Sequence, residues 1–201
     1  MKHDHMKHDL KNPHPAVIIA LILLLSIGLG FLSDFAITCF EKNAYKRDFG
    51  EYVSVYAHKY GVPETLIFAV IRTESSFDSG AVSRVGAVGL MQLMPETFEW
   101  LTDEILFEHL ESGMLYDPET NIRYGTYYLS RMYKHFGNWE TAFAAYNAGP
   151  TIVSKWLKDA AYSTDGKTLS HIPYSETAHY VKKVSGMVEK YKEYSQTEVQ
   201  K

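Results

Sequence analysis

Glu74 is the residue whose position in this sequence most favours acid–base chemistry. It follows an apolar run, residues 66–71, after only Arg72 and Thr73. A carboxylate at a helix C-terminus faces the negative pole of the helix dipole, and apolar neighbours deprive it of water. Both effects raise its pKa, and a general acid that works near neutral pH needs a protonated carboxyl. An isolated glutamate could equally be a solvated helix end, so the assignment depends on other residues.

Three further short blocks combine polar residues with glycines and apolar residues. They are SRVGAVGLMQLMP at residues 83–95, AAYNAG at 144–149 and IPYSETAHYV at 172–181. Gly86 and Gly89 in the first block allow a backbone turn or a close approach to a ligand, because glycine adopts positive φ freely. Any one block alone is a weak indication of function.

The composition argues against several other kinds of site. Cys39 is the only cysteine, which excludes an internal disulfide and a cysteine-based zinc site. The formal net charge is −4, and the basic footprint of a nucleic-acid-binding protein is missing. The histidines after residue 47 lack helical His-x-x-x-His spacing, and nothing in the N-terminal tail would fix a coordination geometry. We therefore expect no metal, no cofactor and no nucleic-acid partner.

An apolar segment near the N-terminus predicts a membrane anchor. Residues 16–32 read AVIIALILLLSIGLGFL and contain Ser26 as their one polar side chain. At roughly 1.5 Å per residue the segment is about 26 Å long, just under the hydrocarbon thickness of a bilayer. A cleaved signal peptide would need suitably spaced small residues soon after the apolar core, and the residues at 33–37 lack them. We expect an uncleaved transmembrane helix over residues 16–35.

The charges that flank this segment leave its orientation open. Three lysines precede it, and two lysines and one arginine follow it within residues 42–47. The positive-inside count is therefore close to a tie. The orientation must follow from where the substrate lies.

The rest of the chain predicts a series of helices in an all-α or α-dominant domain. Apolar residues recur at helical spacing, while Asp117, Asn138 and Ser175 provide helix starts and Gly61 and Gly137 provide ends. The glycine-rich stretch 79–90 predicts a loop with a turn or short strand. The expected helices span residues 48–61, 64–74, 95–107, 118–135, 139–147, 151–159 and 175–194.

Glu74-Ser75 and the three blocks occur in an order that resembles the lytic transglycosylase family of the soluble type. The resemblance covers residues 48–195, and four blocks in one order are far more specific than any one of them. Members of this family cleave peptidoglycan and have a lysozyme-like fold, related to goose-type lysozymes. The resemblance implies a helical domain with a substrate groove, in agreement with the predicted helices.

The resemblance implies catalytic roles for three residues. Glu74 matches the catalytic acid. Ser83 matches a hydroxyl that approaches this carboxyl or the substrate. Tyr146 matches a tyrosine whose hydroxyl forms a hydrogen bond with the catalytic carboxyl, although a tyrosine on an apolar helix is often an ordinary core residue.

Four further residues match positions that contact the substrate. Gln92 and Met94 match groove residues beside the sugar chain, Asn147 a residue that offers a polar group to an N-acetyl arm, and Glu176 a second acid near the groove wall. Three of them have structural alternatives. Gln92 could cap a loop, Met94 could fill the core, and Glu176 could stabilise the first turn of its helix.

The family mechanism implies a single acid–base residue that cuts the β-1,4 bond between N-acetylmuramic acid and N-acetylglucosamine, leaving 1,6-anhydro ends. A hydrolytic muramidase of the same fold and a non-catalytic wall-binding module are the alternatives. The expected partners are peptidoglycan strands and the cytoplasmic membrane, with any partner in the cell-envelope machinery unspecified. Because the substrate lies outside that membrane, the catalytic domain would face the wall.

These expectations divide the chain into five segments. They are a short cytoplasmic tail at 1–15, a transmembrane anchor at 16–35, a linker at 36–47, a catalytic domain at 48–195 and a C-terminal tail at 196–201.

Overall fold

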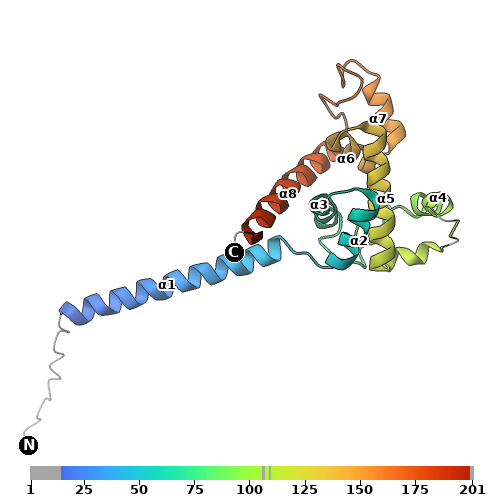
Figure 1. Cartoon of the computed structure of the whole chain (residues 1–201). Helices are drawn as coiled ribbons and strands as arrows, with labels where there is room; N and C mark the ends of the chain where they lie inside the picture. The colour runs from blue at the N-terminus through green and yellow to red at the C-terminus, as the bar shows by residue number, and fades with distance from the viewer. Residues whose placement is uncertain (1–14, 106, 109, 200–201) are drawn as a thin grey trace, which may run out of the picture. The chain divides into compact units, whose positions relative to one another are not determined.

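The computed structural model describes residues 15–105, 107–108 and 110–199 (Figure 1). The chain divides between Ala44 and Tyr45 into two compact units. Within the described residues the regular elements are helices, so the prediction of an α-dominant fold is confirmed. The predicted tail at 1–15 lies almost wholly outside the described residues.

The first unit is the single helix α1, Pro15–Ala44, of 30 residues. Its segment Pro15–Phe40 is long and apolar enough to cross a membrane, with a mean hydropathy of 2.7 and no residue buried inside the protein. Membrane anchors and signal sequences share such length and composition. Residues 36–44, predicted as part of a linker, are helical because Ile37 and Phe40 continue the apolar sequence and no glycine or proline interrupts it.

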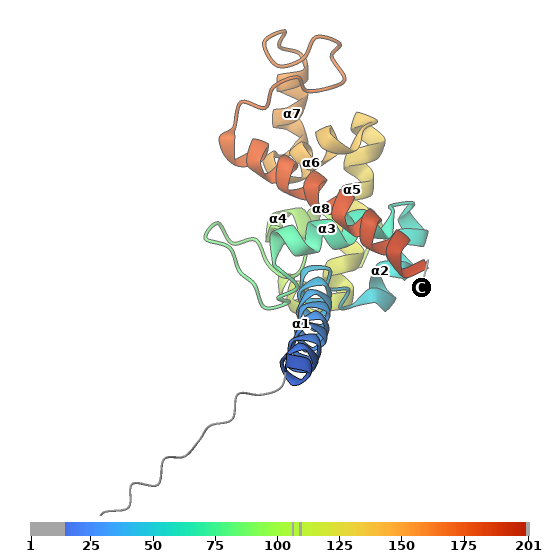
Figure 2. The same ribbon diagram turned by 90° about the vertical axis from the view of Figure 1, so that its left-hand side faces the viewer.

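The second unit, from Tyr45 onward, is a bundle around α3, α5, α6 and α8 (Figure 2). Helix α3 packs along α8, α6 packs against both α5 and α8, and α2 packs against α5. The bounds are α2 Gly50–Tyr60, α3 Glu64–Glu74, α4 Pro95–Ile105, η1 Ser112–Tyr116, α5 Pro118–Phe136, α6 Trp139–Ala148, α7 Pro150–Leu157 and α8 Ser175–Val199. Helix α8 thus enters the predicted C-terminal tail, because the sequence has no breaker there.

The predicted helix signals act as expected. The Asp117 carboxylate accepts a hydrogen bond from the Thr120 amide at 2.8 Å, and the Asn138 side chain accepts one from the Thr141 amide at 2.8 Å. Gly137 ends α5 in the left-handed conformation, with φ of 76°. Each cap satisfies backbone groups that a helix end leaves without partners.

Helix α3 forms the centre of the core. Its residues 66–71 are all buried, and Ile67, Ala69, Val70 and Ile71 have no exposed surface. A helix that is apolar on all sides is stable only when other elements surround it. The sequence pattern that drives α3 into the core therefore also fixes the position of its last residue, Glu74.

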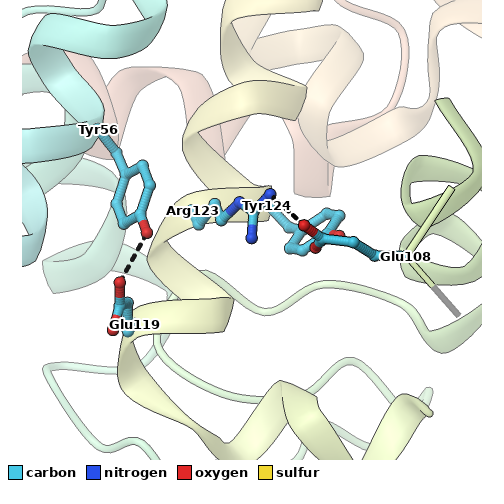
Figure 3. A network of polar contacts seen from close by, with 5 residues as sticks. All are labelled: Tyr56, Glu108, Glu119, Arg123 and Tyr124. Carbon is cyan, nitrogen blue, oxygen red and sulfur yellow. Dashed lines mark hydrogen bonds and ion pairs between the residues drawn. The ribbon is translucent and has the colours of Figure 1, made fainter. Parts of the chain in front are cut away.

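A polar network ties the outer face of α5 to its neighbours (Figure 3). The Tyr56 hydroxyl of α2 donates to Glu119 at 2.8 Å. Arg123 and the Tyr124 hydroxyl donate to Glu108, which follows α4, at 3.0 and 3.1 Å. The Arg123 guanidinium lowers the pKa of Glu108, so this carboxylate stays charged near neutral pH. The network holds the chain segment between α4 and η1 on the domain.

The first residues of the second unit are fixed to the end of α8. The Tyr45 ring stacks on Tyr194 with centroids 5.0 Å apart and meets Tyr191 edge-on at 6.0 Å. The Tyr191 hydroxyl donates to the Lys46 carbonyl at 2.7 Å, and Arg47 donates to the Ser195 hydroxyl at 2.5 Å. Residues 45–47, predicted as the end of a linker, are therefore part of the folded domain.

We expect Tyr45→Ala to lower the melting temperature of the full chain in detergent. Aromatic pairs contribute about 0.5–1.5 kcal/mol each beyond area burial, so loss of both predicts a decrease of roughly 3–9 °C in a domain of this size. Near-ultraviolet circular dichroism would measure it. The matched control is Tyr116→Ala, at a half-exposed tyrosine. Equal melting temperatures for the two variants would show that residue 45 does not stabilise the domain.

Candidate active site

Glu74 is the last residue of α3, at a helix end that is held firmly in place. The Ser75 hydroxyl, immediately after it, donates to the Leu90 carbonyl at 2.8 Å. Ser76 and Phe77 then adopt positive φ of 55° and 69°, a conformation unusual for residues other than glycine. The strained turn and the hydrogen bond fix the direction in which the chain leaves α3. They also limit the positions open to the Glu74 carboxyl.

The surroundings of the Glu74 carboxyl favour its protonated form. Burial raises its pKa from the ordinary value of 4.5 to about 7, although the residue as a whole is partly exposed. Tyr180 and Lys183, both on α8, act in the opposite direction and lower the pKa. The Lys183 ammonium donates to the Thr73 carbonyl at 3.3 Å, which places a cation near the negative end of α3. The carboxyl can therefore exchange its proton near neutral pH, as the sequence indicated.

Tyr180 is a site residue that the sequence analysis missed. Its buried hydroxyl interacts with the Glu74 carboxyl, and burial together with the Glu74 charge raises the pKa of the hydroxyl well above its usual range. The distance and angles between the Tyr180 hydroxyl and its neighbours do not form a well-aligned hydrogen bond with any described residue. Tyr180 lies in the block 172–181, one helical turn after Glu176, and that spacing is the signal that could have identified it.

Tyr146 lies beside Glu74 but donates its hydrogen bond elsewhere. The nearby Glu74 charge, after burial, raises the pKa of its hydroxyl. The proton goes to the Met91 carbonyl at 2.9 Å, and the Tyr146 ring lies 5.2 Å from that of Tyr128. The hydroxyl has one proton and Met91 accepts it, so in this geometry Tyr146 could form the expected hydrogen bond with the carboxyl only by accepting from protonated Glu74. Tyr146 joins α6 to the turn at residues 89–92.

Ser83 and Gln92 hold the loop between α3 and α4. The Ser83 hydroxyl accepts a hydrogen bond from the Ala87 amide at 3.0 Å. The Gln92 side chain donates to the carbonyls of Ala81 and Gly89 at 3.0 and 2.9 Å. Both side chains thus have a structural role here. For Gln92 this role is the loop capping that the sequence analysis gave as an alternative. The Gln92 side-chain oxygen and the Ser83 proton remain available for a ligand in this geometry.

Asn121 of α5 also holds this loop, and the sequence analysis did not identify it. It is fully buried on α5, accepts from the Met91 amide at 2.8 Å and donates to the carbonyls of Val88 and Leu115 at 2.9 and 2.8 Å. Gly89 passes so close that an added Cβ would lie 2.2 Å from the Asn121 side-chain nitrogen. The predicted close approach at Gly89 is therefore to Asn121.

Asn147 and Glu176 meet at an open pocket of about 540 Å³. The Thr177 hydroxyl donates to the Asn147 side-chain oxygen at 2.8 Å and links the end of α6 to the start of α8. This bond orients the Asn147 amide so that its NH₂ group remains a donor. Glu176 is exposed in the first turn of α8 and lines the same pocket.

The structure places most of the candidates in two groups, which are connected through consecutive residues of α6. Glu74 and Tyr146 lie together at the end of α3, while Asn147, next in the chain after Tyr146, shares a pocket with Glu176. Met94 is half-buried just before α4, and its carbonyl accepts the first hydrogen bond of that helix. Glu74 is not among the residues that line the pocket of Asn147 and Glu176. An acid with a raised pKa can protonate a bound oxygen and then accept a proton.

Residues 51–169 match the family model described as the Transglycosylase SLT domain. The chain belongs to this transglycosylase SLT family. It is 43% identical over 126 residues to the soluble lytic murein transglycosylase of Escherichia coli, covering 61% of this chain and 20% of that protein. It is also 40% identical over 92 residues to the membrane-bound lytic murein transglycosylase C of Edwardsiella ictaluri, covering 45% of this chain and 25% of that protein.

Solved structures of SLT-family proteins share the fold. An inactive mutant of the lytic transglycosylase Slt from Pseudomonas aeruginosa superposes with a TM-score of 0.67 at 35% identity, over 76% of this chain and 25% of that one. The 70 kDa soluble lytic transglycosylase of E. coli gives 0.67 at 33% identity, over 75% and 25%. A structure of the 70-kDa soluble lytic transglycosylase with bulgecin A is also known. The chain thus spans a quarter or less of these relatives.

In this SLT-family chain, we expect Gly89→Ala to destabilise the domain far more than Gly86→Ala. Both glycines have positive φ, which costs an alanine about 1–2 kcal/mol, but an added Cβ has open space only at Gly86. At Gly89 the added clash disrupts the three Asn121 hydrogen bonds, so the loss should be roughly 3 kcal/mol or more. Urea unfolding would measure both. Equal losses would contradict the role of Asn121.

We also expect Glu74→Gln to stabilise the protein in a pH-dependent way. The pKa of Glu74 is about 7 in the folded state against an ordinary 4.5, so ionisation costs stability. The cost is absent below pH 4.5, grows as the pH rises and is complete above pH 7, where the variant should gain about 3 kcal/mol. Urea unfolding at several pH values measures it, with exposed Glu51→Gln as the control. A gain independent of pH would contradict the raised pKa.

Proposed function

We propose that the protein is a membrane-anchored peptidoglycan lytic transglycosylase. It would cut the β-1,4 bond between N-acetylmuramic acid and N-acetylglucosamine and leave a 1,6-anhydro end. The observation that carries this proposal is the carboxyl of Glu74, with its pKa raised to about 7 beside Tyr146 and Tyr180. Membership of the SLT family, and relatives named lytic murein transglycosylases, support the substrate and the reaction type.

The first step is protonation of the glycosidic oxygen by Glu74. A pKa of about 7 leaves a substantial fraction of the carboxyl protonated at neutral pH, as a general acid requires. As the bond from the anomeric carbon to this oxygen breaks, the substrate's own N-acetyl group stabilises the positive charge on the carbon. The Asn147 amide, which the Thr177 hydrogen bond orients, would hold such an N-acetyl arm. Glu74 becomes ionised in this step, and the nearby Tyr180 and Lys183 stabilise its charge.

The second step restores the protonated form of Glu74. The ionised Glu74 takes the proton from the C6 hydroxyl of the muramic acid, and the C6 oxygen bonds to the anomeric carbon. One carbon–oxygen bond is broken and one is formed, the proton moves from the C6 oxygen to the leaving oxygen through Glu74, and no water is consumed. The nucleophile is part of the same sugar, so proximity supplies much of the rate enhancement.

A single carboxyl suffices for this reaction, whereas most glycosidases use two. Glu176 is the other candidate acid, and it is exposed at the start of α8 in the pocket that contains Asn147. We assign Glu176 to substrate contact, together with Gln92 and Met94 on the loop before α4. Ser83 and Tyr146 then support the geometry around Glu74.

Helix α1 would anchor the enzyme in the cytoplasmic membrane with a single pass. Its apolar segment Pro15–Phe40 is long enough to cross a bilayer, and several relatives are named membrane-bound lytic murein transglycosylase C. The catalytic domain would lie outside the cell, where peptidoglycan is found. Residues 1–15 would form a short cytoplasmic tail.

Two other functions fit the fold. A muramidase would use water in the second step and leave reducing ends. A wall-binding module would hold glycan without cutting it. The products on purified sacculi distinguish all three, because mass spectrometry detects anhydro ends by their loss of one water and a binding module releases nothing.

We expect Glu74→Gln to retain the fold and lose at least about a hundredfold in the rate of muropeptide release, because the proton donor and acceptor are both removed. Release from sacculi, followed by mass spectrometry, measures the loss and the nature of the ends. Exposed Glu51→Gln is the matched control and should keep full activity. Full activity of the Glu74→Gln variant, or reducing ends from the wild type, would refute the proposal.

A further inference from the structure

Helix α8 supplies a cation to the end of α3. The Lys183 ammonium donates to the Thr73 carbonyl at 3.3 Å, and Thr73 immediately precedes Glu74. The last four carbonyls of a helix have no partner within the helix, so a lysine near them both satisfies a carbonyl and opposes the negative end of the helix dipole. Lys183 therefore caps α3 from a different helix, one residue before the proposed acid.

Other polar groups at the end of α3 satisfy carbonyls without bringing a charge. The Ser75 amide donates to the Ile71 carbonyl at 3.1 Å, and the Ser76 hydroxyl donates to the Arg72 carbonyl at 3.4 Å. Of these capping contacts, the one at the Thr73 carbonyl brings a full positive charge. The hydrogen bond at Thr73 also fixes the place of that charge, although the lysine side chain is largely in solvent.

The ionisable groups that act on Glu74 lie on α8 and α6. Helix α8 presents Lys183 and, three residues earlier on the same face, Tyr180, while α6 presents Tyr146. The two tyrosine hydroxyls are neutral near neutral pH, because burial raises their pKa. The lysine is therefore the member of this group that brings a net charge to the acid.

Other charged groups near the end of α3 are directed elsewhere. Arg72, earlier on α3, acts on the hydroxyl of Tyr191. In the loop after α3, the Asp78 carboxylate accepts a hydrogen bond from a backbone amide two residues later, and Arg84 is exposed. The cation that lowers the pKa of the acid is Lys183.

We propose that Lys183 is a positioning residue for the reaction, whose ammonium, held by the Thr73 carbonyl, sets how far toward alkaline pH the enzyme works. It does so by stabilising the ionised Glu74 that exists between the two proton transfers. The proposal rests on the proposed function, because it takes Glu74 as the acid that must be protonated when the reaction begins. Lys183 acts through Glu74 and needs no contact with the sugar.

Loss of this charge should move the alkaline limit of activity upward. The first step needs protonated Glu74, so kcat/KM falls as the pH rises through the pKa of the carboxyl. A nearby cation favours the ionised form, and its removal raises the pKa above the present value of about 7. Lys183→Gln should therefore stay active to a pH about 0.2–0.7 unit higher than the wild type, the range that an exposed charge pair produces.

Three variants of the full chain separate the charge from a structural role. Lys183→Gln keeps a hydrogen-bond donor without the charge, and Lys183→Arg keeps both. Lys182→Gln removes the charge of an exposed neighbour that points about 100° away around α8. The pH profile of kcat/KM on soluble glycan strands should shift for Lys183→Gln and match the wild type for the other two. The shift should shrink at high salt, which screens exposed charges.

An NMR titration of the Glu74 carboxyl measures the same effect without turnover. Its ¹³C signal, assigned as the one missing from Glu74→Gln, should titrate at a higher pH in Lys183→Gln than in the wild type. The same midpoint in these two proteins would overturn the role of Lys183. Equal shifts in Lys182→Gln and Lys183→Gln would do so too, since they would reflect net charge alone, and a shift in Lys183→Arg as large as in Lys183→Gln would show a structural role.

These measurements distinguish failure of this inference from failure of the proposed function. If the wild type releases anhydro ends while Lys183→Gln keeps the wild-type pH profile and carboxyl titration, the role of Lys183 is refuted and the transglycosylase stands. If the wild type releases no anhydro ends, the transglycosylase is refuted, and the carboxyl titration still decides whether Lys183 controls the protonation of Glu74.

Discussion

The rest of the site depends on the removal of water from one carboxyl. Helix α3 is apolar on all its faces, so the core surrounds it and brings Glu74 to a position where solvent is scarce. The resulting pKa of about 7 costs folding free energy whenever the carboxyl is ionised. Tyr180 and Lys183 reduce this cost without abolishing it, and a carboxyl balanced in this way can both donate and accept a proton near neutral pH.

The loop between α3 and α4 connects the end of α3 to α5 and α6. Asn121 holds Met91 and Val88, Met91 accepts the proton of Tyr146, and Leu90 accepts that of Ser75. The loop, the end of α3 and the end of α6 are therefore joined through hydrogen bonds rather than through apolar packing alone. Hydrogen bonds of defined geometry hold catalytic groups more precisely than packing does, and proximity effects are lost when groups move by about 1 Å.

Local patterns in the sequence predicted what depends on neighbours along the chain. The caps Asp117 and Asn138 and the helical periodicity follow from residues within one or two turns. The apolar run before Glu74 also indicated the burial that raises the pKa of this residue. Contacts between distant segments had no such signal. Tyr180 meets Glu74, and Asn121 meets Met91, only because the fold brings α8 and α5 to these places. Tyr146 likewise donates to Met91, a partner that the sequence did not indicate.

The segment before α2 is a second case in which the sequence did not indicate contacts between distant parts of the chain. Tyr45 and Arg47 were predicted to lie in a linker, because residues 41–47 are mostly polar and have no helical period of apolar residues. Their partners, Tyr194 and Ser195, lie about 150 positions later at the end of α8. Helix α8 thus contacts the first residues of the domain at one end and contributes to the pocket of Asn147 at the other. Between these ends it carries the residues that adjust the charge of Glu74, so its packing against α3 couples the position of the acid to the boundary with α1.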